Sequence, residues 1–135
     1  MKKIICMILT MIILKSFAGC SMISEEDVKL RDLDFTVLSE EKIPQELSAI
    51  IEEKEGGAFK LTYSDNEFLY ICIGYGEQPT GGYSIAVNEL YLTDNAIYVN
   101  TQLLGPQASE KGNKVPSYPY IVIKTEYLDK TVIFR

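Results

Sequence analysis

The chain has 135 residues, room for one domain, and its 19 acidic and 13 basic residues give a net charge of −6. An anionic protein is repelled by phosphate backbones and acidic lipid headgroups, so this balance excludes the nucleic-acid-binding classes. There is no histidine, which removes the usual general base, the Ser/His and Cys/His catalytic pairs and most zinc sites.

The first residues have the pattern of a secretion signal. Lys2 and Lys3 precede an apolar run, Ile4–Leu14, which is too short to span a bilayer but has the length of a signal-peptide core. Residues 16–20 then read SFAGC, which resembles the lipobox of bacterial lipoproteins. In that pattern the cysteine is alkylated with diacylglycerol and becomes the new N-terminus. Phe17 stands where the pattern usually has leucine, and Lys15 interrupts the apolar run.

This resemblance implies a lipoprotein signal peptide at residues 1–19 and a lipid on Cys20. Residues 20–34 mix charges with isolated apolar residues and have no strong period, which predicts a flexible tether, and one domain is expected over residues 35–135. The resemblance places the domain outside the cytoplasm, held to the bacterial cell membrane by the lipid. An ordinary signal peptide cut nearby, or an uncleaved anchor, remains an alternative, and both also export the domain. Residues 1–19 hold three lysines and no acidic residue, so their removal would take the net charge from −6 to −9.

The first elements after the tether are a strand and a helix. Phe35–Leu38 is short and rich in β-prone residues, which predicts a strand. Pro44–Lys54 predicts an amphipathic helix with proline at its first position, because apolar residues from Leu47 to Ile51 recur at spacings of three and four. Gly56-Gly57 predicts a left-handed cap that ends this helix.

From Ala58 onward the apolar period changes from 3.6 to 2, which predicts strands. A polar turn at residues 64–67 leads to Phe68–Ile73, which is apolar at nearly every position and so predicts a central strand covered on both faces. Cys72 lies in that strand. With Cys6 removed and Cys20 lipidated it has no disulfide partner, and we expect a small core residue.

Gly74–Val87 reads GYGEQPTGGYSIAV, an apolar strand, a Gly/Pro-rich connection and an alternating strand. The proline fixes one φ angle and the two adjacent glycines allow positive φ, so the connection predicts a specific turn. The alternation slips at Glu89, which predicts either a β-bulge or a bend between two strands. Asp94-Asn95 predicts a hairpin turn into Ile97–Leu103.

An irregular segment over residues 104–117 precedes two final strands, Tyr118–Tyr127 and Lys130–Phe134, with Pro119 at the start of the first. The order gives about seven strands and one helix. We therefore predict an α+β domain that is mostly antiparallel β, either a curled sheet or a small sandwich, with the helix packed on one side. The nine tyrosines suit either the margins of the core or an exposed interface.

No residue pattern predicts catalysis. The paired carboxylates, such as Glu52-Glu53, lie on expected solvent-facing positions, and the Asp65–Glu67 turn lacks the spacing of a calcium loop. The glycines of residues 74–82 are not followed by a helix that could bind phosphate. We expect no enzymatic activity, no cofactor, no metal and no small-molecule substrate.

Two separated motifs carry a family resemblance. PTGGY at residues 79–83, followed by Tyr-Pro-Tyr at residues 118–120, resembles the C-terminal domain of the protease complex subunit PrcB family, over roughly residues 35–135. The resemblance implies a non-catalytic interaction module, an accessory or stabilising subunit whose candidate partner is a surface protease or another envelope protein. It marks as structural or partner-binding Pro79, Thr80, Gly81, Gly82, Tyr83, Tyr118, Pro119 and Tyr120.

A second resemblance supplies the alternative function. PTGGY is similar to the Asn-Pro-Thr-Thr-Gly-Tyr loop that chagasin-type cysteine-protease inhibitors insert into a protease cleft. Gln78 stands in place of the asparagine and Gly81 in place of the second threonine. This resemblance implies a protease inhibitor that presents the Pro79–Tyr83 loop.

Overall fold

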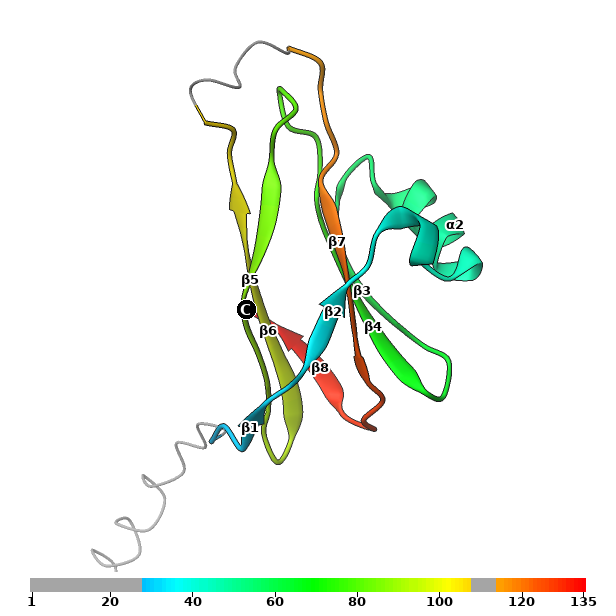
Figure 1. The fold of residues 1–135 in the computed structure, drawn as a ribbon, viewed down its shortest axis with the longest axis vertical. Coiled ribbons are helices and arrows are strands. Elements are labelled where there is room, and N and C mark those ends of the chain that lie inside the picture. Colours follow the sequence, from blue (N-terminus) through cyan, green and yellow to red (C-terminus); the bar gives the residue numbers. More distant parts are fainter. Residues whose placement is uncertain (1–27, 108–113) are drawn as a thin grey trace, which may run out of the picture.

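Two four-stranded β-sheets pack face to face in the computed structural model, which describes residues 28–107 and 114–135 (Figure 1). The first sheet has the spatial order β1 (Arg31–Asp32), β5 (Ser84–Leu92), β6 (Ala96–Leu104) and β8 (Thr131–Phe134). The second has the order β2 (Phe35–Val37), β7 (Tyr120–Glu126), β4 (Phe68–Tyr75) and β3 (Ala58–Ser64). A 3-10 turn, η1 (Glu40–Lys42), and one α-helix, α2 (Gln45–Lys54), lie between β2 and β3. The predicted class is confirmed, and of the two predicted forms the sandwich is the one observed. The leader and Cys20 lie outside the described residues.

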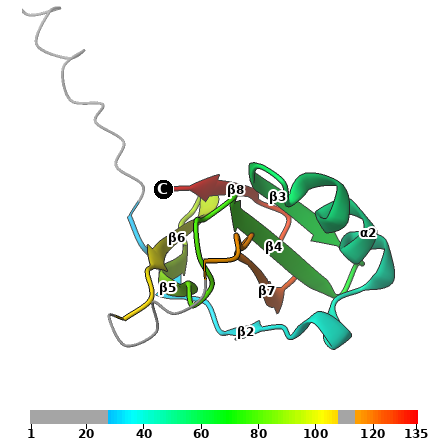
Figure 2. The same cartoon turned by 90° about the horizontal axis from the view of Figure 1, so that it is seen from above.

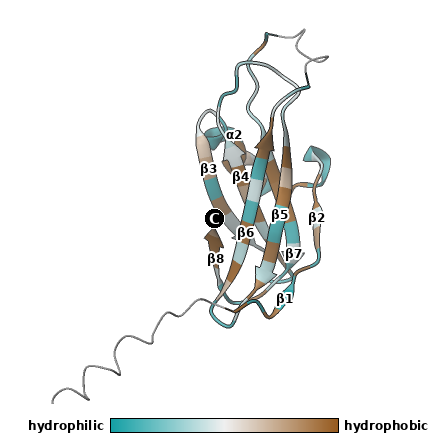
Figure 3. Ribbon diagram, turned by 90° about the vertical axis from the view of Figure 1, so that its left-hand side faces the viewer, coloured by the Kyte–Doolittle hydropathy of each residue, from teal (hydrophilic) through white to brown (hydrophobic). Residues whose placement is uncertain are grey.

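The core between the sheets is made by alternate residues of the facing strands. In β4 the side chains of Leu69, Ile71 and Ile73 pack into it, and in β6 those of Ile97 and Val99 do. Figure 3 shows the matching alternation of hydrophobic and hydrophilic residues along β5 and β6. The alternation holds because successive strand residues point to opposite faces.

The outer face of the second sheet is covered by the helix. Tyr70 and Cys72 of β4 point away from the other sheet and pack with Leu47 and Ile51 of α2. Figure 2 shows α2 on the side of the second sheet that faces away from the first. The prediction that Phe68–Ile73 is a central strand covered on both faces is therefore confirmed.

The helix begins and ends differently from the prediction. Pro44 occupies the N-cap position, one residue before the helix, and its carbonyl accepts the N–H of Ser48 at 2.9 Å. At the other end, neither Gly56 nor Gly57 has a positive φ, so the expected left-handed cap is wrong. The end is instead closed by a hydrogen bond from the Gly57 N–H to the Lys54 carbonyl at 3.1 Å.

The sandwich includes residues that precede the expected domain boundary at residue 35. Arg31 and Asp32 pair with Leu92 and Tyr91 of β5, and Leu33 is 3% exposed. Residues 31–34, expected in the tether, are thus part of the sandwich.

The sheets are mostly antiparallel, as predicted, with one exception. β8 pairs with β6 in parallel, while the other described strand pairs are antiparallel.

The predicted bulge and hairpin are both present. The pairing of β5 with β6 shifts register between Val87 and Glu89, and the turn between these strands is closed by a hydrogen bond from the Thr93 N–H to the Ala96 carbonyl at 2.9 Å. The buried Thr93 hydroxyl also accepts the Ala96 N–H at 3.0 Å. The Thr93 side chain therefore stabilises the turn in addition to the backbone hydrogen bond.

The sandwich has two distinct ends (Figure 1). At one end, the Leu30 N–H donates to the Leu92 carbonyl at 2.8 Å, so the first described residues lie beside the β5–β6 hairpin. At the other end lies the connection from Tyr75 to Ser84, together with residues 105–107, which follow β6. Over residues 28–107 and 114–135, no helix has the length and apolarity needed to cross a membrane.

Candidate functional site

The two family motifs, about 40 residues apart in the sequence, meet at one end of the sandwich. The backbone groups of Gln78 and Ser117 form a pair of hydrogen bonds, with N···O distances of 2.8 and 3.0 Å. The Tyr75 N–H donates to the Pro119 carbonyl at 3.0 Å. Residues 76–83 and 117–120 therefore form one unit, which we call the turn junction.

Side chains hold the turn junction in place as well. The Ser117 hydroxyl donates to the Thr80 carbonyl at 2.6 Å, and the Gln78 amide donates to the Tyr75 carbonyl at 3.2 Å. The Thr80 hydroxyl donates to the neighbouring Gly81 carbonyl at 3.1 Å. Because bonds reach the turn at both its start and its middle, it keeps one conformation relative to β7.

Two glycines are required by the backbone of the turn junction. Gly76 has a φ of 74° and Gly82 a φ of 84°, the left-handed region that other residues rarely adopt. A Cβ at Gly76 would also lie 3.0 Å from the Ala58 backbone nitrogen. The sequence predicted positive φ at the Gly81-Gly82 pair, and only Gly82 has it.

Part of the turn junction faces solvent. Pro79 and Gly82 are exposed and Tyr118 is 43% exposed, whereas Thr80, Gly81, Tyr83, Pro119 and Tyr120 are half-buried. The structure thus brings all eight predicted residues to one end and divides them. Five of them are packed against neighbouring residues of the domain, and Pro79, Gly82 and Tyr118 face solvent.

Three glutamates lie close to Tyr118, and no sequence motif predicted that they would. Glu52 and Glu55, at the end of α2, line a surface pocket of about 310 Å³ with Glu77 and Tyr118, and the Tyr118 hydroxyl lies 3.5 Å from the Glu77 carboxylate. These residues come from three distant parts of the sequence. The β3–β4 hairpin connects the end of the helix to the turn, and the backbone pairing of Gln78 with Ser117 places Tyr118 beside Glu77.

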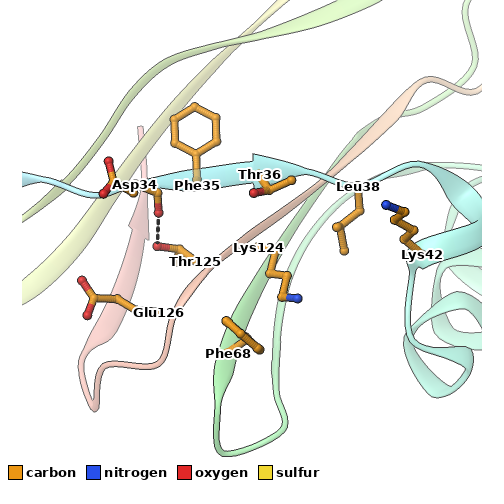
Figure 4. Close-up of a pocket in the computed structure, with 9 residues that line it drawn as sticks. All are labelled: Asp34, Phe35, Thr36, Leu38, Lys42, Phe68, Lys124, Thr125 and Glu126. Atoms are coloured by element: carbon orange, nitrogen blue, oxygen red, sulfur yellow. Dashed lines mark hydrogen bonds between the residues drawn. The ribbon is translucent and has the colours of Figure 1, made fainter.

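A second pocket, of about 380 Å³, lies beside β2 and is shown in Figure 4. The buried Thr125 hydroxyl donates to the Asp34 carbonyl at 2.8 Å, which holds β2 against β7. The Lys124 ammonium lies 3.9 Å from the Phe68 ring centroid, and Glu126 pairs with Arg31 at 2.8 Å. Lys124 and Glu126 are thus engaged with neighbours, and the pocket is a crevice beside the edge strand β2.

Cys72 and Asp65 are among the titratable groups whose pKa values the fold shifts. Burial raises the pKa of the Cys72 thiol to about 12, which keeps it protonated and unreactive at neutral pH. Backbone N–H donors, above all that of Phe68, lower the pKa of Asp65, the acceptor of the β3–β4 turn. Within residues 28–107 and 114–135, no three side chains of His, Cys, Asp or Glu come together as metal ligands.

Comparison with known proteins supports the resemblance of the two motifs. A family model described as PrcB C-terminal matches residues 69–126, which run from β4 through β7 and include the whole turn junction. No curated protein and no solved structure matches the chain. Residues 69–126, and with them the turn junction, are similar to the PrcB C-terminal family.

Proposed function

We propose that this protein is a lipid-anchored, extracytoplasmic, non-catalytic interaction module, an accessory subunit of a surface protease complex. The observation that carries the proposal is the turn junction, where the two motifs of the matched family meet and leave Pro79, Gly82 and Tyr118 exposed. The leader pattern and the cysteine at position 20 support the anchored location.

The positions of the two ends support the same reading. The first described residues leave the sandwich beside the β5–β6 hairpin, and the turn junction lies at the opposite end (Figure 1). Between them run the nine residues of β5, a length of about 30 Å at the usual rise of a strand. A lipid on Cys20 would hold the hairpin end toward the membrane, so the turn junction would point away from it.

The chemistry of the exposed surface suggests the character of the partner. Tyr118 offers a large aromatic contact area with a polar tip, a type of residue enriched among interface hot spots. The carboxylates of Glu52, Glu55 and Glu77 adjoin it. A partner surface with a hydrophobic recess beside basic residues would complement both features.

A pull-down with matched tyrosine variants tests the proposal. Tyr118 and Tyr127 are equally exposed, at 43% each, but Tyr127 lies at the hairpin end, where its N–H donates to Glu67. The tagged full-length protein, solubilised from its own cell envelope, should recover a specific partner. Tyr118→Ala should reduce recovery about 30-fold or more, the loss expected for a hot-spot residue, and Tyr127→Ala should not. Recovery of no partner by the wild type, or equal recovery by both variants, would contradict the proposal.

The anchor is tested separately. Cys20→Ser removes the thiol that the lipid requires, so the variant should move from the detergent phase to the aqueous phase on detergent partitioning, while the wild type stays in the detergent phase. A wild-type protein found in the aqueous phase would contradict the proposed lipid anchor. It would not bear on the proposed role as an interaction module.

The second candidate function is protease inhibition. Pro79 and Gly82 are exposed in the connection between the two sheets, at an end of the sandwich, where such a loop could reach a cleft. Titration of the full-length protein against papain-like and subtilisin-like proteases decides this candidate. Absence of inhibition at micromolar concentration rejects it.

A further inference from the structure

The outer edge of β3 carries backbone N–H and C=O groups that pair with no described strand, and the strand register shows which residues they belong to. β3 is the outermost strand of the second sheet, and no described strand lies beyond it. Hydrogen bonds from the Tyr127 N–H to the Glu67 carbonyl at 3.2 Å and from the Tyr75 N–H to the Pro119 carbonyl at 3.0 Å show which β4 residues face β7, namely the odd-numbered ones. Along a central antiparallel strand, successive residues form their backbone hydrogen bonds alternately with the strand on one side and the strand on the other. The even-numbered residues of β4 therefore form their hydrogen bonds with β3.

The register of β3 with β4 then identifies the groups at the edge. Tyr63, Leu61 and Phe59 lie opposite the even-numbered β4 residues, so their backbone groups bond to β4. The N–H and C=O groups of the residues between them point away from the sheet. These residues are Ala58, Lys60, Thr62 and Ser64.

This edge has few of the devices by which proteins usually prevent strand pairing. Its seven residues contain no proline, and its register with β4 is continuous and without a bulge. The single charged side chain of the strand is that of Lys60, whose ammonium lies 5.8 Å from the ring centroid of Phe134, in the opposing sheet. One charge is thus the only such device on β3, and in an antiparallel pair it can be placed opposite a neutral residue.

We propose that β3 pairs antiparallel with β3 of a second copy of this chain, about a two-fold axis at Leu61. In this register Lys60 faces Thr62 of the other copy and Ala58 faces Ser64. These are the residues whose backbone groups point outward, so every unpaired N–H and C=O of the edge finds a partner. A slide of the register by two residues would leave groups at both strand ends unpaired.

The side chains favour the same register. Leu61 would face Leu61, and Phe59 would face Tyr63, all half-buried residues on the helix-covered face of the sheet. These pairs would occupy the positions without hydrogen bonds, where opposing side chains approach most closely, and aromatic pairs there stabilise a sheet. The sequence of the strand is thus complementary to itself, which identifies a second copy as the partner.

A cysteine scan of the full-length protein in membranes tests the register. Opposed residues at a position without hydrogen bonds have Cα atoms about 4.5 Å apart, within disulfide range. Leu61→Cys should therefore form a dimer on a non-reducing gel after mild oxidation. In Thr62→Cys the two cysteines would lie about 7–8 Å apart on the diagonal, beyond easy bridging, so this matched control should stay monomeric. Equal cross-linking of both variants would overturn the proposed register.

A charge series tests the pairing itself without altering a buried residue, since Lys60 and Thr62 are exposed. Thr62→Lys places lysines opposite each other twice and should weaken dimerisation about 2- to 30-fold, and Thr62→Glu should strengthen it by a similar factor. The double variant Lys60→Glu/Thr62→Lys restores opposite charges and should recover the dimer. Analytical sedimentation of the full-length protein in detergent measures the dimer dissociation constant of each variant. A wild type that is monomeric at every concentration, or a double variant as weak as Thr62→Lys, would overturn the proposal. Neither result bears on the proposed function.

Discussion

Gly82 shows how a single backbone angle fixes the turn junction. Its φ of 84° lies in the left-handed region, which a β-branched residue adopts only under strain. We predict that Gly82→Val lowers the free energy of unfolding by about 1–3 kcal/mol, measured by urea denaturation. Gly57→Val is the control, because a Cβ at Gly57 meets no atom within 4 Å and its φ is not positive. Equal denaturation midpoints for the two variants would contradict the role assigned to Gly82.

Cys72 predicts a pH dependence of stability. Burial raises its pKa from 9.0 to about 12 in the folded protein, so above pH 9 the unfolded chain loses a proton that the folded chain keeps. The stabilisation is full below pH 9 and falls as the pH rises from 9 toward 12, with a slope approaching 1.4 kcal/mol per pH unit for one group. Urea denaturation between pH 8 and 10.5 should therefore show a steeper loss for the wild type than for Cys72→Ala. Parallel curves would show that the thiol is not the cause.

At the scale of elements, the β3–β4 hairpin depends on a contact between a glycine and an aromatic ring. Phe59 and Gly74 are cross-strand partners, and a Cβ at Gly74 would overlap the Phe59 ring, with its Cζ atom 2.9 Å away. Gly74→Ala must displace the ring, and we predict a loss of about 1–3 kcal/mol. Phe59→Leu removes the clash, so the double variant should lose less than the sum of the single losses in urea denaturation. Additive losses would contradict the contact.

The elements that the sequence predicted well are those whose own residues determine them. Phe68–Ile73 has apolar side chains on both faces and is covered on both. β1 could not be predicted, because Arg31 and Asp32 carry no apolar pattern and become a strand only through pairing with β5. The prediction of a left-handed helix cap was wrong for a related reason. Glycines permit a left-handed residue without requiring one, and Gly56 and Gly57 do not adopt it.

At the scale of the whole molecule, alternation predicts which residues face inward but not which strands are neighbours. A curled sheet and a sandwich remained equally compatible with the sequence, and the parallel contact of β8 with β6 had no local signal. The same holds for the site. The motifs at residues 79–83 and 118–120 were visible in the sequence, whereas the carboxylates of Glu52 and Glu55 reach Tyr118 only through the tertiary fold.

The strand order also has a consequence for folding. β2 pairs with β7, so Phe35 finds Thr125 across about 90 residues of chain, and β8 must return to β6 to complete the first sheet. Such long-range closures carry a large entropic cost before any contact compensates for it, and domains of this kind fold in milliseconds to seconds. Because β7 and β8 are the last strands in the chain and each belongs to a different sheet, neither sheet is complete until nearly the whole domain has been synthesised. Any shortening of the chain before β7 would leave β2 and β4 without their shared neighbour.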